Sequence, residues 1–175
     1  MGGWLLGDTR QKVGHHDEKE RWWAEHGVGL ERVCLETGDY MNPADHTVTV
    51  DTKRGIAEVV GNVGRDHARF VRECDRAAAS GLRLVVLVEE GVEYNDRSKL
   101  EQWRPVPCRG RCSWVQMPCP RTMRCKWFRR KPLQGSTVRR IIRTLERDHG
   151  VTFVFCDPDK AAQTVCDILG VDYDP

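Results

Sequence analysis

The stretch TVTVDTKRG, residues 47–55, alternates polar or charged residues with valines. This period of two predicts a half-buried β-strand, because successive side chains of a strand point to opposite faces of the sheet. Val48 and Val50 can then pack on a core, while Asp51 and Lys53 share the opposite face. The strand therefore ends by presenting a carboxylate and an ammonium group side by side.

Strand and helix patterns alternate on both sides of this stretch. Pro43, within the turn-forming segment MNPADH, predicts that residues 30–53 form an antiparallel hairpin. Alternating strands and helices favour a layered α/β fold that contains this hairpin in its sheet. Strands are predicted at 4–6, 30–37, 47–53, 82–90 and 151–156, and helices at 17–27, 56–80 (interrupted near 61–64), 137–147 and 158–170.

Size and composition indicate a single globular domain that spans residues 1–175. Hydrophobic residues make up 39% of the chain and charged residues 31%. No apolar run approaches the roughly 18 to 20 residues that a membrane-spanning helix needs. The N-terminus lacks the pattern of a signal peptide. We therefore expect a cytoplasmic protein without a membrane partner.

The net charge of +2 conceals a strongly basic segment. Residues 104–147 contain 13 Lys or Arg residues and a single acidic residue, Glu146. A block of this kind is typical of proteins that bind a polyanion such as DNA. The alternative is that this segment is a solvated, partly disordered insertion, because disordered segments are also rich in charged residues.

Residues 94–132 show no strand or helix pattern, and we interpret them as a Cys-, Arg- and Trp-rich insertion within the domain. Four thiolates this close in sequence can hold a structural Zn²⁺ ion. Their spacing lacks the C-x₂-C pairs of common zinc ribbons, so free reduced cysteines in a basic loop remain the alternative. The cysteines concerned are Cys108, Cys112, Cys119 and Cys125.

Basic residues in the insertion are interleaved with Trp114, Trp127 and Phe128. This combination suits phosphate contacts together with stacking on unpaired bases. The aromatic residues could instead cover the sheet, and the arginines of the helix at 137–147 could simply face solvent. The candidate DNA-binding residues are Arg109, Arg111, Arg121, Arg124, Lys126, Arg129, Arg130, Lys131, Arg139 and Arg143.

Three acidic residues fall at comparable positions of the predicted strands. Asp8 ends the first strand, and a turn at 43–45 brings Asp39 within two or three residues of lying opposite Asp51. Two carboxylates at this separation favour a divalent cation, and oxygen ligands suit Mg²⁺ or Mn²⁺. Lys53 can orient a water molecule and stabilise charge that develops on a phosphate. The alternative is an exposed hairpin whose charges face water.

Several segments together resemble a known enzyme family. GDY at 38–40 followed by VDTKRG at 50–55 resembles the signature of XPF-type structure-specific endonucleases, members of the PD-(D/E)XK superfamily, in which a GD is followed after a hairpin by E-R-K. GDTRQK at 7–12 is similar to the D-x-R-E strand of that family. Residues 65–90 and 135–156 resemble the elements that follow in its short phage and prophage members.

The resemblance covers most of the chain outside 94–132 and implies a restriction-endonuclease-like fold, a mixed central sheet flanked by helices. It also implies a role for each matching residue. These are Asp39 and Asp51 as metal ligands with the backbone carbonyl of Thr52, Asp8 as an auxiliary acid near the metal, Lys53 as the catalytic lysine, and Arg10 as the arginine that holds the scissile phosphate or an adjacent acid.

The chain departs from the family pattern at four positions. Asp51 replaces a glutamate, Thr52 replaces the arginine of E-R-K, and Gln11 replaces the glutamate of D-x-R-E. Glu58 follows Lys53 by five residues, where the family has an acid four residues after the lysine. The sequence also shows no tandem helix-hairpin-helix module, which many members use to dimerise, and a homodimer is left open.

The sequence therefore predicts a Mg²⁺- or Mn²⁺-dependent endodeoxyribonuclease that hydrolyses phosphodiester bonds, selectively in flap, branched or junction DNA. The resemblance implies a role in phage-type recombination, repair or genome processing. DNA is the expected partner, and no small-molecule cofactor is expected. The alternatives are a catalytically inactive DNA-binding module on a nuclease fold and a zinc-stabilised protein-interaction module.

Overall fold

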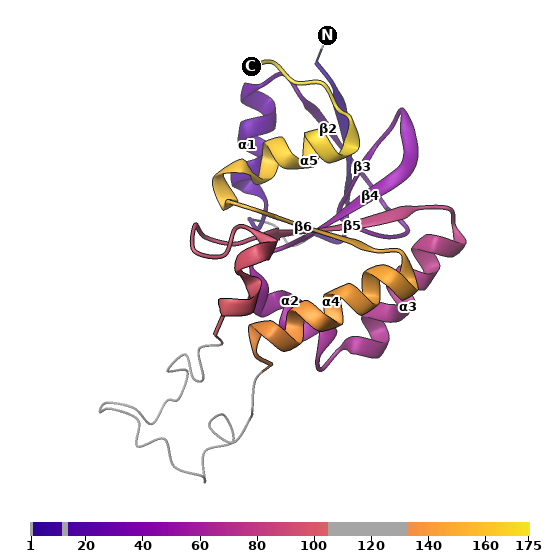
Figure 1. The fold of residues 1–175 in the computed structure, drawn as a ribbon. Coiled ribbons are helices and arrows are strands. Elements are labelled where there is room, and N and C mark those ends of the chain that lie inside the picture. Colours follow the sequence, from indigo (N-terminus) through magenta and orange to yellow (C-terminus); the bar gives the residue numbers. More distant parts are fainter. Residues whose placement is uncertain (1, 12–13, 105–132) are drawn as a thin grey trace, which may run out of the picture.

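A computed structural model describes residues 2–11, 14–104 and 133–175, and shows a central sheet between two layers of helices (Figure 1). None of the helices in this described part is both long and apolar enough to cross a membrane. Because helices cover both faces of the sheet, the fold is α/β, as predicted. One face is covered by α1 (Asp17–Glu25) and α5 (Ala161–Leu169), and the other by α2 (Ile56–Val63), α3 (His67–Ala79) and α4 (Gly135–His149).

The sheet is mixed, with the strand order β2-β1-β3-β4-β5-β6. Only β3 runs antiparallel to its neighbours, and the other adjacent strands are parallel. The predicted mixed central sheet flanked by helices is thereby confirmed. The strands are β1 (Trp4–Asp8), β2 (Gly29–Val33), β3 (Tyr40–Asn42), β4 (Asp45–Lys53), β5 (Arg83–Glu89) and β6 (Thr152–Cys156).

The predicted hairpin over residues 30–53 is wrong in its first strand. β2 ends at Val33 and pairs in parallel with β1 at the edge of the sheet, and α1 makes the crossover between these two strands. The antiparallel hairpin is instead β3 with β4, in which Tyr40 pairs with Val50. A strand pattern identifies a strand but not its partner, which is why the sequence could not distinguish these pairings.

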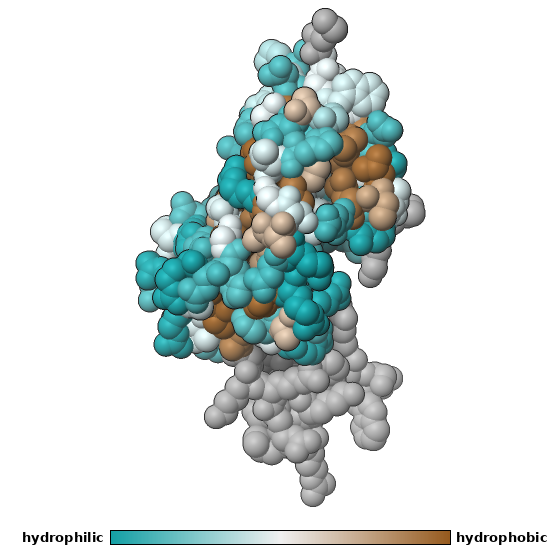
Figure 2. Space-filling view, turned by 90° about the vertical axis from the view of Figure 1, so that its right-hand side faces the viewer, coloured by the Kyte–Doolittle hydropathy of each residue, from teal (hydrophilic) through white to brown (hydrophobic). Residues whose placement is uncertain are grey.

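Two apolar clusters pack on the two faces of the sheet, and β5 contributes to both. Val86 and Val88 join the cluster beneath α2, α3 and α4, while Val85 and Leu87 join the cluster with α1 and α5. The continuous apolar run of this strand is therefore buried on both faces, as expected for a central parallel strand. Figure 2, seen from the side on which α3 lies in Figure 1, shows a mostly hydrophilic surface over the lower helical layer.

The predicted interruption near 61–64 is confirmed, since α2 ends at Val63 and α3 begins at His67. Asp17 and Glu20 have the spacing of a capping box, which predicts that Asp17 caps the helix, but the structure does not form it. The residue at the N-cap of α1 is His16, which makes no side-chain capping hydrogen bond. Glu20 forms an ion pair with Arg32 on β2 instead. A tertiary ion pair thus engages the side chain that the local pattern assigned to the helix end.

Residues 94–104, at the start of the predicted insertion, belong to the packed domain. They contain a 3₁₀-helix, η1 (Arg97–Gln102), whose Leu100 is fully buried with Trp103 against α4. The contact is so close that a Cβ atom on Gly135 would lie 2.0 Å from the carbonyl oxygen of Leu100. The predicted zinc ligands Cys108, Cys112, Cys119 and Cys125, and the DNA-binding candidates from Arg109 to Lys131, lie outside the described residues.

Candidate active site

Three acidic residues lie in one row across β1, β3 and β4. Asp39 directly precedes β3, and the registers of β3 with β1 and with β4 include the pairs Gly7↔Tyr40 and Tyr40↔Val50, so Asp39 lies near Asp8 and Asp51. The Asp8 N–H donates to the carbonyl of Asp39 over 2.9 Å, whereas the Asp39 N–H donates over 2.7 Å to the carbonyl of Val50, the partner of Tyr40. Asp51 pairs with Val86 and therefore lies on the face covered by α2, α3 and α4.

Asp51 and Lys53 form a buried ion pair at the end of β4. Lys53 Nζ donates to Asp51 Oδ1 over 2.7 Å, and the two side chains are only 12% and 9% exposed. Oδ2 of Asp51 lies 2.5 Å from the same nitrogen, yet it has no partner in hydrogen-bonding geometry among the described residues. The pair therefore leaves one buried carboxylate oxygen without a directed partner.

The environment acts on both members of this pair. Burial raises the pKa of the Asp51 carboxyl group well above its usual range, against the opposing effect of the Lys53 ammonium. Burial by itself would lower the pKa of Lys53, but the charge of Asp51 outweighs it and raises that pKa. A cation beside Asp51 would relieve the cost of its buried negative charge.

Asp39 is held in place by Thr52. Its Oδ2 accepts hydrogen bonds from the Thr52 backbone N–H over 2.8 Å and from the Thr52 hydroxyl over 2.6 Å. Its Oδ1 makes no hydrogen bond with the described residues, which leaves this oxygen available. Thr52 stands where the family has an arginine, and here its hydroxyl orients the neighbouring carboxylate.

Asp8 is engaged by Arg10 and by the loop that follows β2. Arg10 Nε donates to Asp8 Oδ2 over 2.8 Å, and the Leu35 backbone N–H donates to Asp8 Oδ1 over 3.2 Å. The carboxylate of Asp8 raises the pKa of the Arg10 guanidinium, whose side chain is 59% exposed. Of the two roles that the resemblance gave Arg10, the structure shows contact with an adjacent acid.

Asp39 and Asp51 offer carboxylate oxygens, the ligands that a divalent cation such as Mg²⁺ or Mn²⁺ prefers. Among the described residues, no group of three or more His, Cys, Asp or Glu side chains is arranged to hold a metal ion. Asp39 and Asp51 nevertheless fit as neighbouring oxygen donors, because Oδ1 of Asp39 makes no hydrogen bond with the described residues and a bound cation could share the Asp51 carboxylate with Lys53. Mg²⁺ and Mn²⁺ accept such sites and fill their other positions with water or phosphate oxygens. Asp8 is engaged by Arg10 in this arrangement, so its role as an auxiliary acid near the metal stays a prediction.

Two residues that the sequence did not single out lie near this row. The negative charge of Glu73, on α3, adds to burial in raising the pKa of Asp51 and adds to Asp8 in raising that of Arg10. His16 lies on the other side of the sheet, with its Nδ1 atom 2.7 Å from the hydroxyl oxygen of Tyr40. The sequence offered one signal for Glu73, an acid directly beside the apolar stripe of its helix.

Glu58, which follows Lys53 by five residues, serves the start of α2. Its Oε2 accepts a hydrogen bond from the backbone N–H of Arg54 over 2.9 Å. Glu90 caps the same turn, because its Oε2 accepts from the Ile56 N–H over 2.9 Å. Satisfying the free N–H groups of a helix start is a structural role, and it explains the shifted position of this acid.

On α4, the two candidate DNA-binding arginines differ in their contacts. Arg139 forms an ion pair with Glu101 of η1, so its guanidinium helps to hold η1 on the helix. Arg143 is exposed and forms no ion pair with the described residues. Arg143 is therefore the more accessible of the two to a polyanion.

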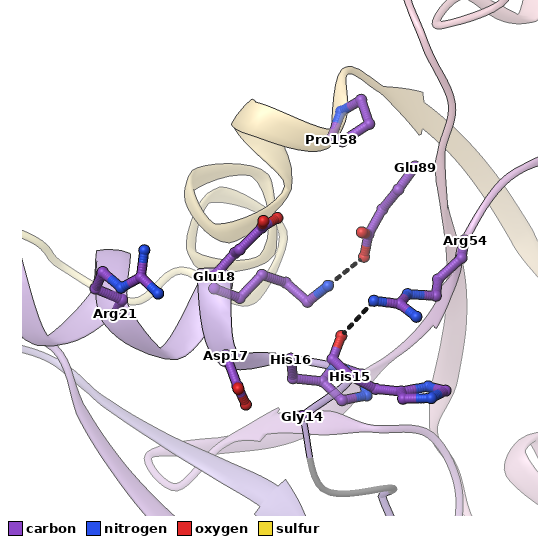
Figure 3. Close-up of a pocket in the computed structure, with 10 residues that line it drawn as sticks. Gly14, His15, His16, Asp17, Glu18, Arg21, Arg54, Glu89 and Pro158 are labelled. Carbon is purple, nitrogen blue, oxygen red and sulfur yellow. Dashed lines mark hydrogen bonds and ion pairs between the residues drawn. The ribbon is translucent and has the colours of Figure 1, made fainter.

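A pocket of about 470 Å³ opens beyond the ends of β4 and β5 (Figure 3). Its lining includes the buried ion pair between Lys19 Nζ and Glu89 Oε1, 2.6 Å apart. Figure 3 shows Arg54 reaching in from the residue after Lys53, where its Nη2 donates to the His15 carbonyl over 3.3 Å. The lining carries charges of both signs and does not by itself select a ligand.

Comparison with known proteins supports the fold. No protein-family model matches the chain, and no curated protein matches its sequence significantly. XPF from Aeropyrum pernix is structurally similar, with a TM-score of 0.58, 16% identity, and coverage of 95% of this chain and 63% of that chain. XPF from the same organism in complex with DNA gives a TM-score of 0.60, 15% identity, and coverage of 96% and 64%.

The chain has an XPF-like fold. It spans less than two thirds of the length of the two XPF chains, and the low identity means that the likeness concerns the fold alone. The predicted restriction-endonuclease-like arrangement agrees with this likeness. The chemistry of the site must be argued from the residues of this chain.

Proposed function

We propose that this protein is a divalent-metal-dependent endonuclease that hydrolyses phosphodiester bonds in DNA. One observation carries the proposal: the Asp39 carboxylate is bonded to Thr52, next to Asp51, and the ammonium of Lys53 is held on Asp51 at the end of β4. The XPF-like fold supports it, as does the DNA complex formed by one of the two similar structures.

Each residue of the site has a role in this reaction. Asp39 and Asp51 would hold the cation, which when bound would supply Lewis acidity and neutralise charge on the scissile phosphate. Lys53 places an ammonium group where negative charge develops on the phosphoryl oxygens and can orient the water that attacks. Thr52 fixes the direction of the Asp39 carboxylate. Arg10 forms an ion pair with Asp8, and its side chain is largely exposed to solvent.

The finer parts of the proposal come from the motif resemblance. They are a preference for flap, branched or junction DNA and a role in phage-type recombination, repair or genome processing in the cytoplasm. The basic stretch 104–147 supports DNA as the partner, because a cluster of Lys and Arg residues attracts a polyanion.

The test is cleavage of labelled duplex, flap and four-way-junction DNA with Mg²⁺ or Mn²⁺. We expect wild-type protein to cut and the Asp51→Asn variant to lose on the order of 100-fold or more in rate, as when a principal charge-stabilising group is removed. Asp45→Asn is a matched control, because this exposed aspartate lies on the same strand away from the row. No cutting by wild type with either metal on any of the substrates would refute the proposal.

The second candidate is an inactive DNA-binding module. It is favoured by the engagement of Asp8 with Arg10 and by the absence of a metal-binding group of three such side chains within the described ranges. This candidate predicts DNA affinity that falls steeply with salt, no cutting, and no change in thermal stability when Mn²⁺ is added.

A further inference from the structure

A stripe of arginines runs along α3, outside the site described above. Arg69, Arg72 and Arg76 are three and four residues apart and therefore lie on one flank of the helix. All three are exposed, and none makes a side-chain hydrogen bond or ion pair with the described residues. Arg65 continues the stripe one turn before the helix and is paired with Asp66 over 3.2 Å.

The stripe lies next to the flank of α3 that faces the candidate active site. Glu73 on that flank acts electrostatically on Asp51. Ser80, seven residues further along, donates from its hydroxyl to Glu36 over 3.2 Å, in the loop that leads to Asp39. Residues seven apart share a flank, so the hydrogen bond of Ser80 turns the flank of Glu73 toward the loop that leads to Asp39. The arginines occupy the adjoining solvent-facing flank.

The lack of pairing distinguishes this stripe from three other arginines of the same helical layer, whereas Arg140 and Arg143 on α4 are likewise exposed and unpaired among the described residues. Arg97, Arg139 and Arg147 each form an ion pair with a nearby acid. Like charges three or four residues apart on a helix repel each other and destabilise it slightly. Figure 2 shows that the surface of this layer is hydrophilic on the side where α3 lies. A flank of exposed arginines that form no ion pair with the described residues is complementary to a polyanion.

The dimensions of the stripe suit a nucleic-acid strand. Arg69 and Arg76 are seven residues apart, which corresponds to about 10 Å along a helix. One strand of duplex DNA carries a charge about every 3.4 Å along its axis, so three guanidinium groups can follow the phosphates of a single strand. Guanidinium groups also bind phosphate oxygens in a bidentate manner.

We infer that Arg69, Arg72 and Arg76 bind the sugar–phosphate backbone of a DNA duplex arm and hold it beside the Asp39–Asp51 row. The inference rests on the proposed function for the position of the reacting bond. Contacts to phosphates carry no base information, so this surface would contribute affinity and orientation without sequence preference.

The test is fluorescence anisotropy with labelled duplex and flap DNA in EDTA, where no cutting occurs, over a series of KCl concentrations. The R69Q/R72Q/R76Q variant is compared with wild type and with R21Q/R83Q/K160Q, which removes the same charge from exposed positions elsewhere. We expect the stripe variant to bind on the order of 100-fold more weakly near 0.1 M salt, with a log–log salt slope smaller by about three. The control variant should keep the wild-type slope.

The outcomes separate this inference from the proposed function. Equal affinity and slope in the two triple variants would overturn the inference, whatever the wild type cuts. Selective loss of binding in the stripe variant, without cutting by wild type, would retain the inference and overturn the nuclease proposal. Wild-type protein that binds no DNA would overturn the inference as well. Glutamine is a good helix former, and thermal unfolding of both variants verifies that they fold.

Discussion

Two buried pairs of a lysine with a carboxylate lie at the ends of neighbouring strands, and they differ in one respect. Lys53 with Asp51 ends β4, and Lys19 on α1 reaches Glu89 at the end of β5. Their side chains are similarly buried, at 12% and 9% exposure against 8% and 10%. The Asp51 carboxylate, however, has an oxygen without a hydrogen bond, and the next residue, Thr52, holds a second carboxylate, Asp39.

This difference separates a structural ion pair from one that suits a ligand. The Lys19–Glu89 pair joins elements seventy residues apart in sequence and so fastens α1 to the sheet. The Lys53–Asp51 pair joins residues two apart on one strand and ties no second element to it. Burying this pair costs free energy, and the pair does not connect two elements of the fold. Such a costly buried pair is expected where ligand binding or catalysis requires it.

The largest expected effect is on cleavage by Lys53→Met. Removing the ammonium group should lower the cutting rate by about 100- to 1000-fold, the usual effect of removing one group that stabilises developing charge. The variant should stay folded, because the raised pKa of Asp51 allows that carboxyl group to become neutral. The measurement is the single-turnover rate of cleavage. Lys19→Met is the control, and its folded molecules should cut at the wild-type rate. Equal rates for wild type and Lys53→Met would remove Lys53 from the mechanism.

Lys19→Met should have the larger effect on stability. It leaves the Glu89 carboxylate buried without its partner, which costs about 3 kcal/mol in comparable cases. Urea unfolding measures the loss. The double variant Lys19→Met/Glu89→Leu should recover most of it, because an apolar pair replaces the buried charges. A single variant as stable as wild type would show that the pair does not fasten α1.

Mn²⁺ should stabilise the protein against thermal unfolding through Asp39 and Asp51. At a free concentration 100 times its dissociation constant, a ligand specific to the folded state contributes about 2.7 kcal/mol. The increase in Tm should vanish in Asp51→Asn and persist in Asp45→Asn, the exposed aspartate on the same strand. An increase of the same size in all three proteins would place the metal elsewhere.

The smallest expected effect concerns His16, whose pKa depends both on Lys19 and on Asp39. Burial, followed by the charge of Lys19, lowers the pKa of His16 from 6.5 to about 4, while Asp39 acts in the opposite sense. The unfolded chain therefore takes up the proton first, and the stabilisation from His16 is lost as pH falls from about 6.5 to about 4.

Since the His16 ring is partly exposed, we expect wild type to lose about 1 kcal/mol more than His16→Gln between pH 7 and pH 5, after allowing for solvent screening. Urea unfolding of both proteins across that range measures the difference. Parallel pH profiles would show that His16 is not held neutral by its surroundings.

Much of the fold could be predicted from local patterns. The break between α2 and α3, the doubly buried β5 and the layered α/β class followed from periodicity and from glycine positions. The pairing of β2 with β1 could not be predicted, because a strand pattern does not specify which neighbouring strand it pairs with. The packing of η1 also escaped prediction, since a short 3₁₀ turn has too few residues to show a period.

The sequence by itself determined that Asp51 and Lys53 share a face at a strand end, because alternation along a strand is a local property of the backbone. Only the tertiary structure decided what surrounds them. The pairing of β3 with two strands brings Asp39 near Asp8 and Asp51, Arg10 engages Asp8, and Thr52 holds Asp39 on the strand of Asp51. These contacts depend on pairings between distant segments, whose free energies are set by packing of the whole domain.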